Sequence, residues 1–368
     1  MKLAILANDR PSFIKPLSLG LQKMLSRINV ECDIFYNGLD LLDSVKPETS
    51  FSINDQLRAK AFSYFKNKQP NSFLKLVERL KEYDCIVVCL NVPAAYMHER
   101  FRGIEMLRKY LKVPIVNYDL HTIFGLGPFT SYLIEPEGKA PGLERFDYNL
   151  LVTDTTYHGL PDLDYNYSVI GLDMRDNILD TEHKKGIVFL VDFERPGYED
   201  ESKVIMEALK KTNSEYTQLK GVYSMEEIRK LSRGFAGYFL AFPEAFGLPI
   251  VELQLCGCYI FTAHNLWPLS HFHKNKFEKG EGKLGRNFIV YDNSVDKLCA
   301  EIEKLKKDYN PMQVLHQFEQ DYPDYYSGNE TELKKFIEKL KSGEINHLSH
   351  LKNKKLNQPV YEFYLRNK

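Results

Sequence analysis

Two glutamates, Glu244 and Glu252, stand with seven residues between them in the segment PEAFGLPIVELQLCGCYI (243–260). We expect a strand to end just before Glu244 and a helix to begin near Leu248, because the proline that follows Leu248 suits the first turn of a helix. A carboxylate accepts two hydrogen bonds, so Glu252, inside the helix, could bind the vicinal 2′- and 3′-hydroxyls of a ribose. Glu244, in the loop, could contact the hydroxyls of a sugar. A lone buried carboxylate is costly, so we expect neither side chain to face an apolar core.

The start of this predicted helix also suits an anion. The backbone N–H groups around Phe246, Gly247 and Leu248 would lack partners there, and the helix dipole adds positive potential. Gly247 has no Cβ, which lets a phosphate approach the backbone. A diphosphate could therefore dock at this point without much basic charge nearby.

Five polar residues follow two predicted strands in the first half of the chain: Asn8, Asp9, Arg10, Asp119 and His121. The strands are expected at 2–7 and 114–118. In open α/β sheets, ligands bind beyond the carboxyl ends of the strands. We therefore predict that these five residues contact a second substrate. The alternatives are a plain turn for the first three and a structural role for the histidine.

Other catalytic or metal-binding patterns are missing from the sequence. His271 and His273 alternate with Phe272, but no third metal ligand is evident. No Ser-His-Asp order, Walker-type Gly-x4-Gly-Lys or Gly-x-Gly-x-x-Gly motif occurs after the first strand. The cysteines have no zinc-like spacing and are predicted to be reduced thiols: Cys32, Cys85, Cys89, Cys256, Cys258 and Cys299. We expect no metal and no cofactor.

The composition is that of a folded two-domain protein. The chain has 368 residues, of which 43% are hydrophobic and 27% are charged, and its net charge is -1. No global field would recruit nucleic acid or a membrane. No secretory signal and no apolar stretch of ~20 residues is present, so we predict a cytoplasmic protein. We expect a basic cluster at Lys352, Lys354 and Lys355 to be a solvated surface, with contact with the inner face of a membrane as the alternative.

Short apolar runs alternate with amphipathic segments along the whole chain. This alternation predicts an α/β protein with two doubly wound parallel sheets. The aperiodic, polar stretch 159–185 marks the change from one domain to the next. We place an N-terminal domain at 1–165, a C-terminal domain at 166–345, and a last segment, 346–368, that packs back on the N-terminal domain.

The segment from Glu244 to Glu252 resembles the Glu-x7-Glu signature of the retaining GT-B glycosyltransferases of family four. The resemblance continues through Leu255–Ile260 and extends over about 170–305, and in the first half it is only architectural. That family often has Gly-Arg after the first strand of its second domain and a lysine soon afterwards. Here the nearest cations are Arg195 and, less closely, Lys203.

The resemblance implies two Rossmann-like domains that face a cleft, with a nucleotide-sugar donor on the second domain and an acceptor on the first. In that scheme Glu244 and Arg195 are catalytic, and the residues that bind the donor are Glu252, Phe246, Gly247, Leu248 and Lys203. The implied activity moves a hexose or deoxyhexose from a nucleoside diphosphate to a carbohydrate or lipid-linked acceptor. It implies retention of configuration and a role in bacterial surface polysaccharide or glycoconjugate synthesis.

Two alternatives remain open from the sequence. One is a GT-B nucleotide-sugar epimerase, and the other is a non-catalytic two-domain α/β protein that binds a small ligand. For the glycosyltransferase we expect no nucleic-acid partner.

Overall fold

The computed structural model describes most of the chain: residues 1–8, 14–45, 71–89, 97–120, 145–153, 167–177, 186–221, 223, 227, 230–231, 233–244, 247–265, 267, 271–272 and 283–353. Several residues singled out in the sequence lie outside these ranges: Asp9, Arg10, His121, Phe246, His273, Lys354 and Lys355.

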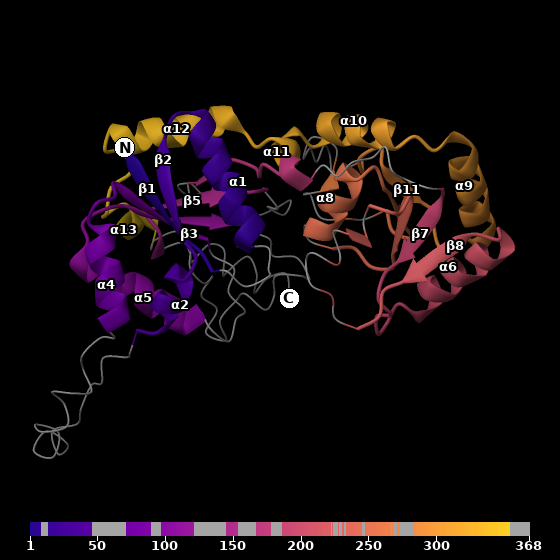
Figure 1. Ribbon diagram of the computed structural model, residues 1–368, viewed down its shortest axis with the longest axis horizontal. Coiled ribbons are helices and arrows are strands. Elements are labelled where there is room, and N and C mark those ends of the chain that lie inside the picture. The colour runs from indigo at the N-terminus through magenta and orange to yellow at the C-terminus, as the bar shows by residue number, and fades with distance from the viewer. Residues whose placement is uncertain are drawn as a thin grey trace, which may run out of the picture.

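A parallel sheet organises the first half of the chain (Figure 1). Among the described residues its six strands run in the order β2-β1-β3-β4-β5-β6. They are β1 (Lys2–Leu6), β2 (Glu31–Phe35), β3 (Cys85–Cys89), β4 (Ile115–Asp119), β5 (Tyr148–Leu151) and β6 (Tyr167–Val169). The central strands β3, β4 and β5 are buried along their whole length, which explains why β3 reads as an apolar run without alternation.

Helices cover both faces of this sheet. They are α1 (Ile14–Arg27), α2 (Gly38–Asp43), α4 (Asn71–Leu80) and α5 (Met97–Tyr110). Figure 1 shows α1 on one side of the strands and α2, α4 and α5 together on the other. The helix α4 has the expected apolar face, with Phe73, Leu76, Val77 and Leu80 buried.

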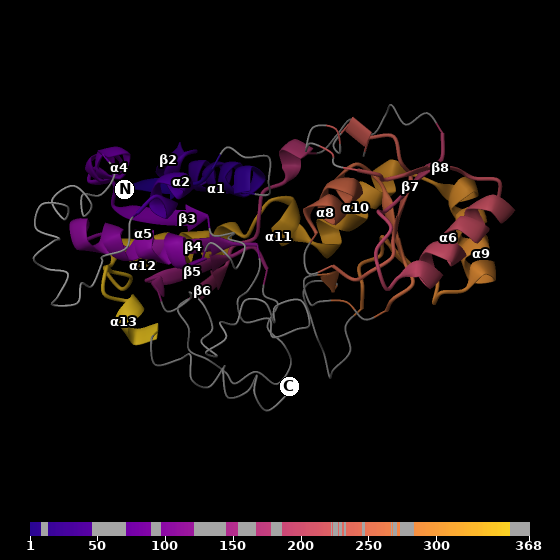
Figure 2. The same ribbon diagram turned by 90° about the horizontal axis from the view of Figure 1, so that it is seen from below.

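A second parallel sheet begins after the first and has the order β11-β10-β9-β7-β8 among the described residues. Its strands are β7 (Val188–Val191), β8 (Glu215–Gln218), β9 (Gly237–Leu240), β10 (Tyr259–Thr262) and β11 (Phe288–Val290). Its helices are α6 (Glu199–Lys211), α8 (Leu248–Leu255), α9 (Val295–Asp308) and α10 (Pro311–Asp321). The helices α6 and α9 pack together, and so do α8 and α10, as Figure 2 shows from below. The two predicted doubly wound sheets are confirmed.

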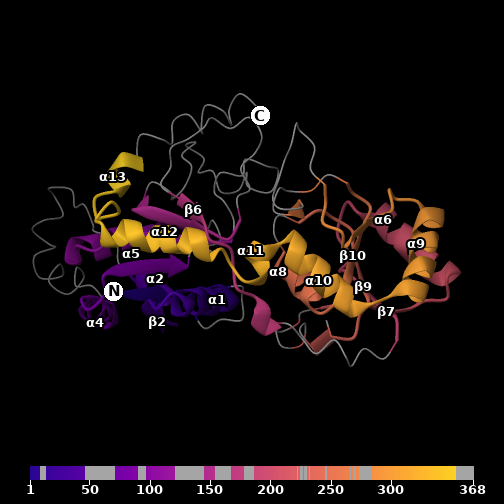
Figure 3. The ribbon, with the colours of Figure 1, turned by 90° about the horizontal axis from the view of Figure 1, so that it is seen from above.

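The end of the described chain returns to the first sheet through α11 (Pro323–Tyr326), α12 (Glu330–Lys341) and α13 (His350–Asn353). Figure 3 shows α12 lying along the first domain. The ring of Phe336 stacks on that of Tyr148 at 5.6 Å. Near the end of the described chain, His350 Nδ1 lies 2.8 Å from a carboxylate oxygen of Asp147.

The domain boundary differs from the one expected at 165/166. Both β6 and α12 fall within 166–345, yet β6 pairs with β5 and α12 packs on β6 and α1. The strand β6 has only three residues, which is too short to show a period in the sequence. The apolar stripe of α12 indicates that the helix needs a partner, but it does not identify the partner.

The chain crosses between the domains twice, and the crossings run side by side. The N–H of Leu172 donates to the carbonyl of Asp324 at 2.7 Å, and that of Asn329 donates to the carbonyl of Ile170 at 2.7 Å. Gly171 has φ of 69°, and a Cβ on it would lie 2.1 Å from the oxygen of Asp324. Only glycine therefore allows the two crossings to approach this closely.

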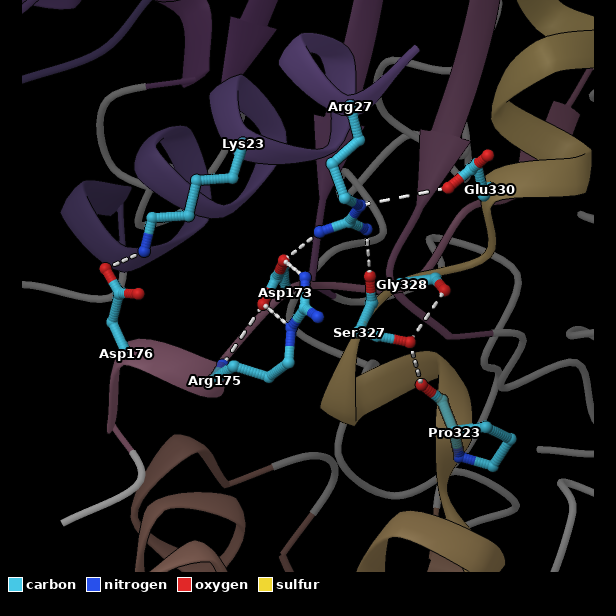
Figure 4. Close-up of polar contacts among 9 residues, drawn as sticks. All are labelled: Lys23, Arg27, Asp173, Arg175, Asp176, Pro323, Ser327, Gly328 and Glu330. Carbon is cyan, nitrogen blue, oxygen red and sulfur yellow. Dashed lines mark hydrogen bonds and ion pairs between the residues drawn. The ribbon is translucent and has the colours of Figure 1, made fainter. Parts of the chain in front are cut away.

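Arg27, at the end of α1, ties both crossings to the first domain (Figure 4). Its guanidinium donates to the buried carboxylate of Asp173 on one crossing and to the carbonyl of Ser327 on the other. Arg175 donates to the same carboxylate at 2.7 and 3.1 Å. A cavity of about 420 Å³ lies beside this cluster, lined by Lys23, Ser26, Arg27, Asp173, Arg175 and Asp176.

Candidate functional site

Two of the residues predicted to bind a donor, Gly247 and Leu248, lie at the carboxyl edge of the second sheet. The first strand, β7, lies between β8 and β9, so the chain passes from β7 to β8 on one side and then returns past β7 to β9 on the other. This is the switch point at which open α/β sheets bind ligands. Asp192 follows β7, Glu244 comes shortly after β9, and α6 and α8 both begin at this edge.

Glu244 lies directly against the start of α8. Gly247, the residue before the helix, has φ of 64° and ψ of 83°. A Cβ on Gly247 would lie 2.6 Å from Oε2 of Glu244 and 2.8 Å from Cδ1 of Ile250. The glycine is thus required by its own backbone conformation and by the glutamate carboxylate above it.

The two helices that begin at this edge differ in their suitability for an anion. The first turn of α6 carries Glu199, Asp200 and Glu201, and Glu199 accepts hydrogen bonds from the N–H of Gly197 at 3.0 and 3.1 Å. The first turn of α8 has no acidic residue and no side-chain cap. A phosphate would meet three acidic side chains in the first turn of α6, whereas the first turn of α8 carries none and has only the carboxyl of Glu244 beside it. The start of α8 is therefore the more favourable of the two places.

Glu244 has an unusual environment for a carboxyl group. Its pKa is raised to about 7, chiefly by burial and also by the nearby charge of Asp192, while the charge of Arg195 opposes the shift. At neutral pH the group is therefore a mixture of the acid and the carboxylate. In either form it can hydrogen-bond to a hydroxyl.

Arg195 is held beside Glu244 by two contacts. Its Nε lies 3.4 Å from Oδ2 of Asp192, and its guanidinium carbon lies 4.1 Å from the centre of the Phe242 ring. Asp192 is buried and also accepts a hydrogen bond from Tyr238. The arginine side chain itself is 44% exposed, so it can reach a ligand from this anchored position. The structure thus brings the two residues predicted to be catalytic into one electrostatic cluster.

The side chain of Lys203 pairs with a residue of its own helix, α6, and not with this cluster. Lys203 stands on α6 with its side chain 75% exposed, and it forms an ion pair with Asp200 at 2.8 Å. Its role in donor binding stays a prediction.

Glu252 differs from the expectation that it would avoid the core. It is only 1% exposed, because α8 is buried along nearly its whole length. The helix packs against α10 and against the short 3-10 helix at Arg175–Asn177. The eight-residue segment from Leu248 to Leu255 is thus a central helix of the domain, and the donor role of Glu252 stays a prediction.

Two histidines organise the loop that carries Glu244, and the sequence did not assign this role to them. His264 Nε2 lies 3.0 Å from the carbonyl oxygen of Ala241, and His271 Nε2 lies 3.0 Å from that of Glu244. In the sequence His271 was only a poor metal candidate. Within the described residues no group of three or more His, Cys, Asp or Glu side chains could hold a metal ion.

Two of the predicted acceptor-side residues are described, and both lie at the carboxyl edge of the first sheet. Asn8 follows β1 and forms an isolated bridge with Asn37, and Asp119 is the buried last residue of β4. The strand β3 separates β1 from β4 in the sheet. Their contact with an acceptor stays a prediction.

No protein-family model matches the chain, and no curated protein sequence matches it. Solved structures do. One is an alpha-glucosyltransferase in complex with UDP and a 13-mer DNA containing a HMU base, with 12% sequence identity, a TM-score of 0.54, and coverage of 93% of this chain and 99% of that chain. An alpha-glucosyltransferase in complex with UDP has 12% identity, a TM-score of 0.53 and coverage of 93% and 100%. The pneumococcal O-GlcNAc transferase GtfA in complex with UDP and GlcNAc has 9% identity, a TM-score of 0.51 and coverage of 93% and 99%. What the chain shares with these proteins at such identities is the fold, and that fold is the GT-B arrangement of two parallel-sheet α/β domains.

Proposed function

We propose that this protein is a glycosyltransferase that takes a sugar from a nucleoside diphosphate and passes it to an acceptor bound by the first domain. One observation carries the proposal. The start of α8 has no acidic residue in its first turn and lies beside Glu244. The positive charge of Arg195, which follows the neighbouring strand β7, acts to lower the pKa of Glu244. The GT-B fold supports the proposal, and the similar structures contain UDP.

In the proposed reaction the diphosphate docks at the start of α8. Arg195 neutralises the charge that develops on the leaving nucleoside diphosphate, and this electrostatic contribution should be the largest one. Glu244 orients the donor sugar through its hydroxyls, and Glu252 contacts the nucleoside. Helix dipole and arginine together supply the positive potential, so the proposed reaction requires no metal. Closure of the two domains would exclude water and limit hydrolysis of the donor.

The acceptor we propose is a carbohydrate or a lipid-linked saccharide, as in bacterial surface polysaccharide synthesis, with retention of configuration. The similar alpha-glucosyltransferase is in complex with DNA, so the fold itself does not exclude a nucleic-acid acceptor. Our preference for a saccharide comes from the net charge of -1, which provides no general attraction for a polyanion.

Membrane contact and location also remain part of the proposal. No helix among the described residues is long and apolar enough to span a bilayer. Two lysines of α12 form ion pairs within the helix: Lys334 with Glu330 and Lys335 with Glu332, each at 2.6 Å. A membrane-surface contact would therefore depend on the residues beyond α12, and the cytoplasmic location stays a prediction.

A turnover assay tests this function. We expect the protein to release nucleoside diphosphate from one member of a panel of UDP-, GDP-, dTDP- and ADP-glucose, faster when a saccharide acceptor is added. Arg195→Ala should lower kcat by about 10²–10³-fold, the typical effect of removing one transition-state donor. Lys211→Ala is the matched control, because Lys211 is an exposed cation of α6 paired with Glu207.

The same assay separates the alternatives. Interconversion of donor sugars, with nucleoside diphosphate release that no acceptor accelerates, would favour an epimerase. Binding of free sugars without turnover of any donor would favour the non-catalytic ligand-binding protein.

A further inference from the structure

The short segment between β9 and α8 is held from one side by two imidazoles. A carbonyl oxygen can only accept a hydrogen bond, so the contacts to Ala241 and Glu244 require N–H groups on Nε2 of His264 and His271. The contact of His271 is made to the peptide carbonyl of Glu244 itself. This bond fixes the backbone from which the Glu244 side chain leaves.

His271 is itself fixed on several sides. It is 3% exposed, and its ring meets the rings of Trp267 and Phe288 edge-on at 4.9 and 5.7 Å. Its carbonyl accepts a hydrogen bond from the hydroxyl of Tyr322, which in turn accepts one from the N–H of Gly285 at 2.9 Å. A side chain packed in this way can hold its partner to within a few tenths of an ångström.

His271 also stays neutral. Burial lowers its pKa to about 3, although the hydrogen bond to Glu244 opposes this. The charged and titratable groups that face Glu244 come from the end of β7 and from β9: Asp192, Arg195 and Tyr238. His271 therefore contributes an uncharged N–H donor and leaves the charge balance at Glu244 to those residues.

We propose that His271 is a positioning residue, whose Nε2–H holds the peptide carbonyl of Glu244 and so aims the Glu244 carboxyl at the donor sugar. This inference rests on the proposed function. Binding of the nucleotide at the start of α8 does not require the bond, whereas placement of the sugar does. Loss of the bond should therefore lower kcat and spare nucleotide affinity.

Three variants test the proposal: His271→Ala, His271→Gln and His271→Asn. The amide nitrogen of glutamine lies near the place of Nε2, whereas that of asparagine lies near the place of Nδ1. We expect His271→Ala to lower kcat by about 10–100-fold on the glucose donor that the wild type uses best, since misplacement by ~1 Å costs about that much. The dissociation constant of the matching nucleoside diphosphate should stay unchanged. Glutamine should restore most of kcat, and asparagine should not.

A second readout does not depend on turnover. In ¹³C-carboxyl NMR titrations, the pKa of Glu244 should shift in His271→Ala and return in His271→Gln. His350→Ala is the matched control, because it removes a bonded imidazole from Asp147 in the first domain and should leave the Glu244 titration unchanged. Thermal melts confirm that each variant is folded.

The outcomes distinguish a failure of the proposed function from a failure of the positioning role of His271. A wild type that turns over no donor refutes the proposed function and with it the aiming of Glu244 at a donor sugar, and the NMR titration then tests only whether His271 positions Glu244. An unchanged Glu244 titration in His271→Ala overturns the inference. It is also overturned if kcat and nucleotide affinity fall together without rescue by glutamine, because His271 would then be a core residue only.

Discussion

Replacing Glu244 with glutamine should stabilise the ligand-free protein at pH 8 and change its stability little at pH 5. The pKa of Glu244 is raised by burial to about 7 in the folded protein, from an ordinary value of 4.5. Between these values the folded state holds a proton that the unfolded state has released. Stability therefore falls as the pH rises from about 4.5 to about 7, by roughly 3 kcal/mol in all. Glutamine does not ionise, so the variant escapes this loss.

Urea unfolding of wild type and Glu244→Gln at pH 5, 6, 7 and 8 measures the effect. The difference in unfolding free energy between the two proteins should grow with pH. Glu207→Gln serves as the control, because Glu207 is an exposed glutamate of α6. A difference for Glu244→Gln that does not grow with pH would mean that burial does not raise the pKa of its carboxyl.

Arg27→Ala should destabilise the protein by about 2 kcal/mol at pH 7. The side chain of Asp173 is 2% exposed, and its ion pairs with Arg27 and Arg175 offset the cost of burying its negative charge. Loss of a charge-assisted hydrogen bond to a buried partner costs about 1.5–3 kcal/mol. The variant also frees the carbonyl of Ser327, so both crossings between the domains lose the hydrogen bonds that Arg27 makes to them.

Lys23→Ala is the matched control for Arg27→Ala. Lys23 forms an ion pair with Asp176 in the same cavity, but the Asp176 side chain is 73% exposed, and such pairs contribute less than about 1 kcal/mol.

Burial would raise the pKa of Asp173, yet hydrogen bonds from Arg175 and Arg27 outweigh it and hold the pKa below its usual value. This stabilisation is present above pH 3.8 and is lost as the pH falls through the lowered pKa. If Arg27→Ala and Lys23→Ala lower the free energy of unfolding in urea equally, Arg27 does not stabilise the crossings as described.

The parts of the fold that the sequence predicted are those with strong local patterns. The buried strands β3 and β9 are apolar without a break, and the helix α8 begins where Gly247 and the following Leu-Pro indicated. Parallel strands bring their carboxyl ends to one edge, so the proximity of Glu244 and Arg195 follows from two correctly predicted strands.

The parts that failed depend on tertiary contacts. Strand β6 forms by pairing with β5, and α12 packs back on the first domain. Composition reveals neither contact, so the boundary expected at 165/166 placed both elements in the second domain. The position of His271 near Glu244 depends on a loop 27 residues further along the chain. The burial of Glu252 depends on packing against α10, a helix distant in the sequence, so no local pattern predicted it.

Calorimetric titration of the wild type with UDP, GDP, dTDP, ADP and CMP, with Glu252→Gln and Glu252→Ala in parallel, tests whether the donor binds at the start of α8. We predict that one nucleoside diphosphate binds the wild type and that its affinity falls at least ~10-fold in both folded variants, as expected for loss of a charge-assisted contact. If none of the five binds the wild type, or if one binds and both Glu252 variants retain its full affinity, the donor site is not at the start of α8.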